Sequence, residues 1–478
     1  MVWVCLSLLG LAFLIALPMS WLVRYLSFRL GLVDHAGAER HKAALLPGKP
    51  PVPNTGGVAL FTAVAWPMLA ILLGVWLLPE SFWLTLPRGG EILAHVPGLR
   101  DTSRIGGGVL AALAVVHVLG LYDDRRALGP GVKLGVQLAV AAGLVLFCDI
   151  RVLSFLAEPA PGHAEDAGWI VGGVVGWAAM FLLSLAWIVV ITNAMNFMDN
   201  MDGLAAGVGL IAAGLYLAAT LIAQQWFVAA CSALLVGSLA GFWFHNLPPA
   251  RLYLGDGGSL VLGLMLAVIS VRTTYTQLAP PAGLDTLSPT PIVGPAVAVE
   301  QDNLTAPKNP TLDPARVDPS PTPPATRADP SIQRLEEPTD HREASATPAR
   351  DRLRRLREAS ANQPGSAPGI RGAWYGILMP LLVLAVPLYD FTSVTLIRLR
   401  QGKSPFHGDH NHFSHRLLRQ GFTKPNALVI ILLASLATGL GGVMLGQLAG
   451  WQAGLVALQA AAVLTLLALL ESAGRRPR

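Results

Sequence analysis

The sequence Asn193-Ala-Met-Asn-Phe-Met-Asp-Asn-Met-Asp-Gly203 directly follows an apolar run, Trp169–Thr192, that is long enough to cross a bilayer. Carboxylates and carboxamides are costly to bury in a membrane, so this stretch predicts a functional site at the mouth of a membrane helix. The alternative is a polar helix end that simply meets water. If the helix continues, the side chains of Asn193, Asn196 and Asp199 lie roughly on one face of it. Asp202, just before the glycine, lies partly off that face.

The composition is that of a polytopic α-helical membrane protein. Of 478 residues, 53% are hydrophobic and 13% are charged, and apolar runs of spanning length recur throughout. The scattered Cys5, Cys148 and Cys231 make neither a disulfide framework nor a metal site, so we interpret them as small core residues. No basic residue precedes the first apolar stretch, which favours an uncleaved first span that starts outside over a cleaved signal peptide.

We predict an all-α protein with about eleven transmembrane helices, the N-terminus outside and the C-terminus in the cytoplasm. Short outer loops then carry only Arg88, Arg100, Arg104 and Arg151, and most other basic residues face the cytoplasm, as membrane topology generally requires. The predicted spans lie near 2–23, 57–78, 105–121, 133–148, 169–192, 203–223, 227–244, 258–276, 373–397, 425–447 and 451–471.

Residues 277–370 interrupt this pattern. The segment is rich in Pro, Ala and mixed charge and cannot bury enough apolar surface to fold alone, so we predict a disordered extracytoplasmic insert. Within it, 351–359 has the pattern of a short amphipathic helix. We interpret the insert as a tolerated loop without a catalytic role, between two parts of one transmembrane domain, 1–276 and 371–478.

Two further acidic motifs indicate chemistry with phosphates. Adjacent carboxylates at Asp123 and Asp124 repel each other, and they persist where a cation or a proton relieves the repulsion; nearby Lys133 suits a phosphate. Asp256 stands among glycines, where backbone N–H groups and a hard oxygen ligand together suit Mg²⁺ and a diphosphate. The alternatives are a solvated loop for the first motif and a plain turn for the second.

Other loops add basic and stiff segments. In Pro51-Val-Pro-Asn-Thr-Gly-Gly57 the prolines stiffen the chain, and the two glycines permit close backbone approach. Arg40-His41-Lys42 and the segment 409–416, with three histidines, favour an anionic, phosphorylated substrate, because no cysteine or His-Glu-x-x-His pattern points to zinc. A basic patch that touches lipid head groups is the alternative. Together the clusters favour phosphoryl transfer between one lipid and one soluble substrate.

These clusters, in this order, resemble the polyprenyl-phosphate N-acetylhexosamine-1-phosphate transferases, glycosyltransferase family four. The resemblance rests on Asp-Asp…Leu-x-Pro-x-x-Lys-Leu at 123–134, Asn-x-x-Asn-x-x-Asp-x-x-Asp-Gly-Leu at 193–204 and Gly-Asp-x-Gly-Ser at 255–259. It covers nearly the whole chain except the insert. The Pro51–Gly57 segment and the span count are similar to the branch that uses UDP-N-acetylglucosamine.

The resemblance implies transfer of N-acetylhexosamine-1-phosphate from a UDP-sugar to undecaprenyl phosphate, with release of UMP, as a first membrane step of cell-wall or surface polysaccharide synthesis. It implies a catalytic pair, Asp123 and Asp124, and a Mg²⁺ site, with Mn²⁺ as an alternative, at Asp256 and Asn196. The implied substrate-binding residues, which contact phosphate or line the nucleotide-sugar pocket, are Lys133, Asn193, Asp199, Asp202, His412 and His415.

The resemblance also implies a bacterial inner-membrane protein with a cytoplasmic site, no nucleic-acid partner, and a homodimer as a candidate assembly. One departure falls in a recognition loop, where the usual His-x-His-His reads His412-Phe413-Ser414-His415. Two rivals are an intramembrane Mg²⁺-dependent prenyltransferase and a transporter. The three-residue spacing of the acidic motif disfavours the first, and the placement of the clusters at one face disfavours the second.

Overall fold

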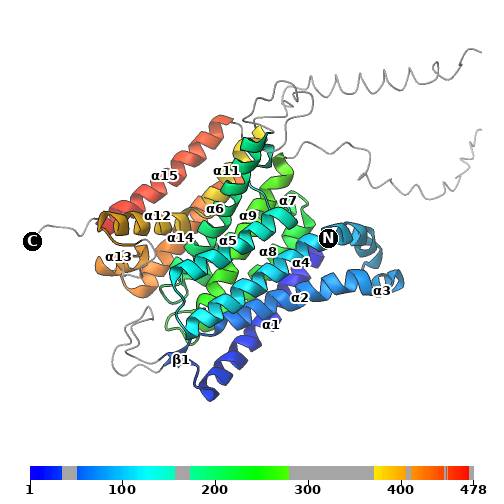
Figure 1. Ribbon diagram of the computed structural model, residues 1–478, viewed down its shortest axis with the longest axis horizontal. Helices are drawn as coiled ribbons and strands as arrows, with labels where there is room; N and C mark the ends of the chain where they lie inside the picture. Colours follow the sequence, from blue (N-terminus) through cyan, green and yellow to red (C-terminus); the bar gives the residue numbers. More distant parts are fainter. Residues whose placement is uncertain are drawn as a thin grey trace, which may run out of the picture. The chain divides into compact units, whose positions relative to one another are not determined.

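Long apolar helices dominate the structure, a computed structural model that describes residues 1–34, 51–156, 173–278, 371–404, 411–445, 448 and 450–472 (Figure 1). The long helices are α1 (Val2–Arg29), α2 (Gly56–Leu77), α4 (Gly89–Arg125), α5 (Pro130–Phe147), α6 (Val174–Met198), α7 (Leu204–Ile222), α8 (Trp226–Asn246), α9 (Asp256–Leu278), α14 (Lys424–Met444) and α15 (Gly450–Ser472). The shorter elements are β1 (Val33–Asp34), β2 (Val52–Pro53), α3 (Glu80–Thr85), η1 (Ser154–Leu156), α11 (Arg371–Val383), α12 (Ala385–Arg400) and α13 (Phe413–Arg419).

The predicted fold class is confirmed. In the part of the chain that the structure describes, 10 helices are long and apolar enough to cross a membrane, and there are 11 spans if one bent pair is counted. That pair is Ile377–Val383 with Ala385–Arg400, bent by 76°. The orientation of the termini stays a prediction. Beyond residue 278, the predicted insert lies outside the described residues.

The largest difference from the predicted spans is in α4. The apolar run predicted a helix over 105–121, but the helix begins at Gly89 and has 37 residues, about 55 Å of length. Its polar first half is held by α2: Arg100 Nε donates to the carbonyl of Val75 at 3.0 Å, and the guanidinium lies 5.9 Å from the ring centre of Trp76. Hydropathy marks only the apolar part of such a helix.

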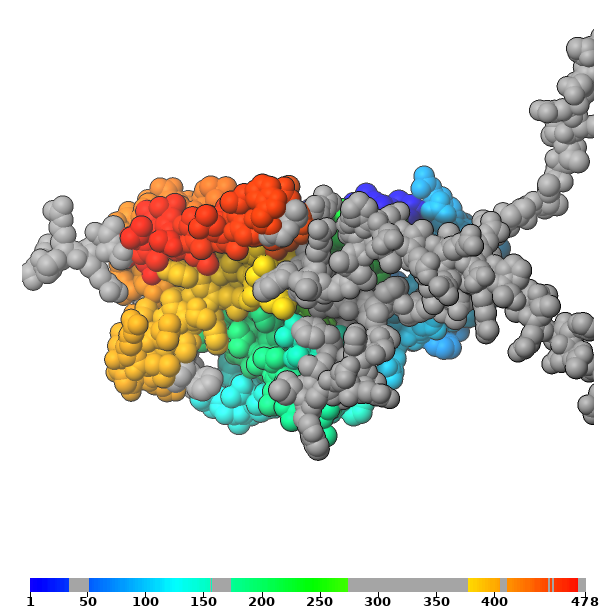
Figure 2. Space-filling view, turned by 90° about the horizontal axis from the view of Figure 1, so that it is seen from above, coloured from blue at the N-terminus to red at the C-terminus, as the bar shows by residue number. Residues whose placement is uncertain are grey.

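The core of the bundle is α9. In its spanning window 89% of the residues are buried, against 11% in α15, which lies on the surface in Figure 2. Small residues let the other helices approach α9 closely, since a Cβ at Gly263 would lie 2.7 Å from Thr192 Cα of α6. A helix buried on every side meets solvent only at its ends, and α9 begins at Asp256.

Candidate active site

Four helices bring acidic, basic and amide side chains together at one end of the bundle. Asp123 lies near the end of α4, Lys133 near the start of α5, Asn196 near the end of α6 and Asp256 at the start of α9. Lys133 Nζ lies 2.8 Å from Asp123 Oδ2 and 2.7 Å from Asp256 Oδ2. Asn196 Nδ2 donates to Asp256 Oδ1 at 2.9 Å. Residues far apart in sequence therefore form one hydrogen-bonded cluster.

Asp124 holds the start of α9 in place. Its Oδ1 accepts hydrogen bonds from Asn54 Nδ2 and from the backbone N–H of Asp256, both at 3.0 Å. Its Oδ2 accepts from the backbone N–H of Gly257 at 3.1 Å. A carboxylate at a helix N-terminus satisfies N–H groups that have no partner within the helix, and it complements the helix dipole. Both oxygens of Asp124 are thus engaged. Asp123 accepts from Lys133 and from the N–H of Leu128, and it also interacts with the side chain of Asp256.

Glycines make this geometry sterically accessible. A Cβ at Gly120 of α4 would lie 2.4 Å from the carbonyl carbon of Asp256, closer than real Cβ atoms come. A Cβ at Gly57 would lie 2.3 Å from the backbone nitrogen of Gly258. The close backbone approach predicted for Gly57 is therefore confirmed. These contacts let α4 and α2 come close enough to α9 for short side chains to bridge them.

The polar stretch after Thr192 continues α6 by six residues, to Met198. Asn193 is on this helix, and its Nδ2 donates to Gln137 Oε1 of α5 at 2.5 Å. Asp199 is the C-cap residue, and its carboxylate is close enough to Asp124 for electrostatic repulsion. The α6 helix therefore continues through Asn193 and Asn196, as the predicted common face of these side chains requires, and it ends at Asp199.

Asp202 contacts a neighbouring turn. Its Oδ2 accepts from the backbone N–H of Ala250 at 3.3 Å. The following residue, Gly203, has φ +75° and donates its N–H to Asn246 Oδ1 at 3.0 Å. The structure therefore ties this end of the predicted motif to the segment after α8.

The histidine segment packs against the end of α6. His412 Nδ1 lies 2.9 Å from Asp390 Oδ2, and the N–H of Phe413 donates to Asp390 Oδ1 at 2.6 Å. The His412 ring meets Phe197 edge to face at 5.4 Å, and the rings of His412 and His415 lie 6.5 Å apart. His412 thus contacts Phe197, the residue that follows Asn196 in the α6 motif, and His415 lies beside His412. Two predicted segments lie outside the part of the chain that the structure describes. These are the Arg40–Lys42 cluster, within residues 35–50, and the start of the histidine segment, Asp409 and His410, within residues 405–410.

Several residues of this network were missed by the sequence analysis as site residues. Their common property is that they bind a predicted residue: Asn54, Gln137, Ser259 and Asp390. Asp390 is fully buried, and a lone carboxylate in the apolar run 373–397 was a signal that could have identified it. Ser414 donates to Asn200 Oδ1, so the serine of the altered histidine motif also has a packed role.

The cluster is partly open and acidic. The side chains of Asp123, Asp256 and Lys133 are 14%, 17% and 22% exposed. Counting Asp124, the cluster holds three carboxylates and a single ammonium group, that of Lys133. Binding of a further cation, alone or together with a substrate, is therefore electrostatically favoured. Among the described residues, no group of three or more His, Cys, Asp or Glu has the arrangement of a ready metal site.

The fold and the cluster define a polytopic membrane protein with a charged site of carboxylate, amide and ammonium groups at one end of its bundle. Residues 107–274, which hold most of the cluster, match the family model of glycosyl transferase family 4. This segment is similar to that family, and the predicted resemblance is confirmed.

Three relatives show the same similarity. The chain is 27% identical over 260 residues to the probable undecaprenyl-phosphate N-acetylglucosaminyl 1-phosphate transferase of Bacillus subtilis (strain 168), covering 54% of this chain and 60% of that protein. It is 35% identical over 261 residues to the decaprenyl-phosphate N-acetylglucosaminephosphotransferase of Mycobacterium tuberculosis (strain ATCC 25618 / H37Rv), covering 52% and 55%. It is 30% identical over 204 residues to the phospho-N-acetylmuramoyl-pentapeptide-transferase of Rubrobacter xylanophilus, covering 40% and 61%. The chain thus spans less than two thirds of the length of these relatives.

Proposed function

We propose that this protein transfers N-acetylhexosamine-1-phosphate, with N-acetylglucosamine as the favoured sugar, from a UDP-sugar to undecaprenyl phosphate and releases UMP. The observation that carries the proposal is the single cluster of Asp123, Lys133, Asn196 and Asp256, built by four helices at one end of the bundle. The relatives' names support it, because they join a polyprenyl phosphate to a phosphosugar.

The donor set fits Mg²⁺, with Mn²⁺ as an alternative. Mg²⁺ is usually held by one or two carboxylates together with waters and substrate phosphates, so it does not require a group of three protein ligands. We assign Asp256 and Asn196, which contact each other at 2.9 Å, as the residues that would hold the ion. When bound, the ion would neutralise charge on the diphosphate of the donor.

The hydrogen bonds suggest different roles for the paired aspartates. Asp124, with three donors on its carboxylate, positions the start of α9 and with it Asp256. Asp123 interacts with the side chain of Asp256 and shares Lys133 with it, so we assign it to the lipid phosphate, which it orients or relieves of a proton. Lys133 keeps the two carboxylates together and offers positive charge to an incoming phosphate.

The reaction then needs positioning more than covalent chemistry. A lipid phosphate oxygen attacks the β-phosphorus of the UDP-sugar, the bond from this phosphorus to the bridging oxygen breaks, and UMP leaves with that oxygen. We assign the nucleotide-sugar side to the residues around the end of α6: Asn193, Asp199, Asp202, His412 and His415. The bias of basic residues in the sequence supports a site on the cytoplasmic face of a bacterial inner membrane.

The proposal is tested by incubating the purified protein with undecaprenyl phosphate, Mg²⁺ and either UDP-N-acetylglucosamine or UDP-N-acetylgalactosamine. We expect UMP to form only when the lipid phosphate is present, and faster with the first donor. Release of UDP in place of UMP, or UMP formation that ignores the lipid, would contradict the proposal. Asp256→Asn is the inactive control.

A further inference from the structure

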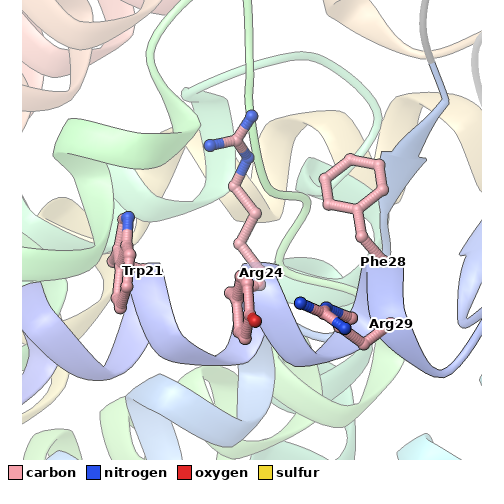
Figure 3. A pocket seen from close by; sticks show the side chains of 5 residues that line it. Trp21, Arg24, Phe28 and Arg29 are labelled. Atoms are coloured by element: carbon pink, nitrogen blue, oxygen red, sulfur yellow. The ribbon is translucent and has the colours of Figure 1, made fainter.

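The end of α1 carries a cluster of cations and aromatic rings that the proposed reaction does not use. A cavity of about 250 Å³ is lined by Trp21, Arg24, Tyr25, Phe28 and Arg29. Figure 3 shows the labelled side chains along α1, with Arg24 and Phe28 extending from one side of the helix and Arg29 lying across its front. We call these five residues the α1 cluster.

Each guanidinium group of the α1 cluster lies beside an aromatic ring. Trp21 and Tyr25 stack with their ring centres 5.8 Å apart and their planes 9° from parallel. Arg29 Cζ lies 5.3 Å from the ring centre of Tyr25, and Arg24 Cζ lies 5.6 Å from that of Phe28. Each guanidinium is therefore positioned by a ring. A cation that contacts the face of a ring can keep its N–H groups, which point outward in the guanidinium plane, available to an acceptor.

The cations of the α1 cluster have no carboxylate partner among the described residues. Arg24 Nε is buried without a hydrogen-bond partner. Arg24 also interacts electrostatically with His245, as does Arg251, so further basic groups approach from the end of α8. Basic groups gathered without an acid repel one another, and a bound anion relieves that repulsion.

We propose that the α1 cluster binds the head-group phosphate of an anionic phospholipid from the surrounding bilayer. A forked guanidinium matches the oxygens of a phosphate, and two of them supply both charge and hydrogen bonds. The inference does not depend on the proposed reaction.

The surroundings favour a lipid over a soluble anion. Trp21, Tyr25 and Phe28 are 58%, 44% and 43% exposed at the end of a spanning helix. At such positions aromatic rings lie at the level of lipid head groups, and arginine side chains extend toward the phosphates. The same helix exposes Leu11 and Leu14 farther along the span, so it offers an apolar surface to acyl chains. Basic residues near the membrane surface attract anionic lipids electrostatically.

The test measures lipid binding to the purified full chain by native mass spectrometry and by the shift in thermal unfolding. Phosphatidylglycerol is expected to bind saturably and to raise Tm, with phosphatidylcholine at least tenfold weaker. The double variant Arg24→Gln, Arg29→Gln is expected to lose at least tenfold in affinity for phosphatidylglycerol. Arg88→Gln is the matched control. Arg88 also lies over an aromatic ring, 6.0 Å from the ring centre of Trp3, but at the other end of α1, so this variant should bind phosphatidylglycerol as the wild type does.

Three results would overturn the proposal: equal affinity of the double variant and the wild type, equal binding of the two lipids, or inorganic phosphate alone giving the same saturable shift. The last result would mean that the occupant is a soluble anion. If the double variant fails to fold, Arg24→Lys replaces it. That change keeps the charge and loses the forked donor, and it should weaken binding severalfold; an unchanged affinity there would equally refute the role of Arg24.

Discussion

Adding one methyl group at Gly120 should separate activity from stability. The Cβ of Gly120→Ala would lie 2.4 Å from the carbonyl carbon of Asp256, whereas ordinary van der Waals contact begins at 3.4 Å. The start of α9 must therefore move away by about 1 Å. Such a shift would stretch the 3.0 Å hydrogen bond from the Asp256 N–H to Asp124 beyond a useful length.

The two consequences differ in size. Overpacking costs about 1–3 kcal/mol, but replacing a helical glycine by alanine recovers about 1 kcal/mol, so the free energy of unfolding should fall by no more than ~2 kcal/mol. A 1 Å displacement of a catalytic group can reduce the rate about 100-fold, which is ~2.7 kcal/mol of transition-state stabilisation. We therefore expect a folded, membrane-inserted protein with about 1% of wild-type UMP release.

Gly107→Ala is the matched control. Gly107 lies in the same helix, is exposed, and has no atom within 4 Å of the added Cβ, so this variant should keep wild-type activity. The assay compares initial rates of UMP release with thermal unfolding for both variants. If Gly120→Ala were as active as the wild type, or if Gly107→Ala lost as much activity, the argument from the close contact of α4 and α9 would fail.

Further predictions concern the charged groups directly. Asp124→Asn and Asp256→Asn should each lower UMP release at least about 1,000-fold while leaving membrane insertion intact, since each removes a negative charge from the cluster; wild-type turnover by either purified variant would overturn the site assignment. Lys133→Met leaves Asp123 and Asp256 facing each other without the ammonium group, so the free energy of unfolding should fall by about 3–5 kcal/mol in EDTA; an unchanged Tm would show that the ion pairs do not matter. Removal of divalent cations with EDTA should stop UMP release by the wild type, and added Mg²⁺ should restore it; activity that survives EDTA would exclude the proposed ion. Asp390→Asn should lower kcat/KM about 10- to 100-fold, because the acceptor that orients the neighbouring imidazole is weakened; a change in Tm without a change in kcat/KM would mean that Asp390 is only structural.

Much of the fold could be predicted because a membrane gives simple rules. Runs of apolar residues located α2, α7 and α14 within a few residues, since only helices of spanning length satisfy the backbone in lipid. The first half of α4 was missed because its stability comes from contacts such as Arg100 with Val75, which leave no trace in hydropathy. The sharp bend between α11 and α12 was not expected either, although the two pieces were predicted as one span.

In the site, too, some residues could be predicted from the sequence and others depend on tertiary contacts. Asp123, Asp124 and Asp256 could be predicted as site residues because carboxylates next to apolar helices are costly and indicate a function. Their partners were harder to find, because Asn54 and Asp124 are 70 residues apart and only the packing of α2, α4 and α9 brings them together. Lys133 was expected to meet a phosphate; the structure pairs it with two carboxylates, which supplies the cation that the adjacent acids required. The ligand role of Asp256 and Asn196 stays a prediction.

The most direct measurement follows the β-phosphate of the sugar donor. The purified protein is given UDP-N-acetylglucosamine that carries a radiolabel only in its β-phosphate, together with undecaprenyl phosphate and Mg²⁺. Transfer of the phosphosugar predicts that the label moves entirely into the lipid product and that the released UMP is unlabelled, with both lost in Asp256→Asn. Label recovered in UDP, with an unlabelled glycolipid, would mean that only the sugar moves, and it would contradict the proposed reaction.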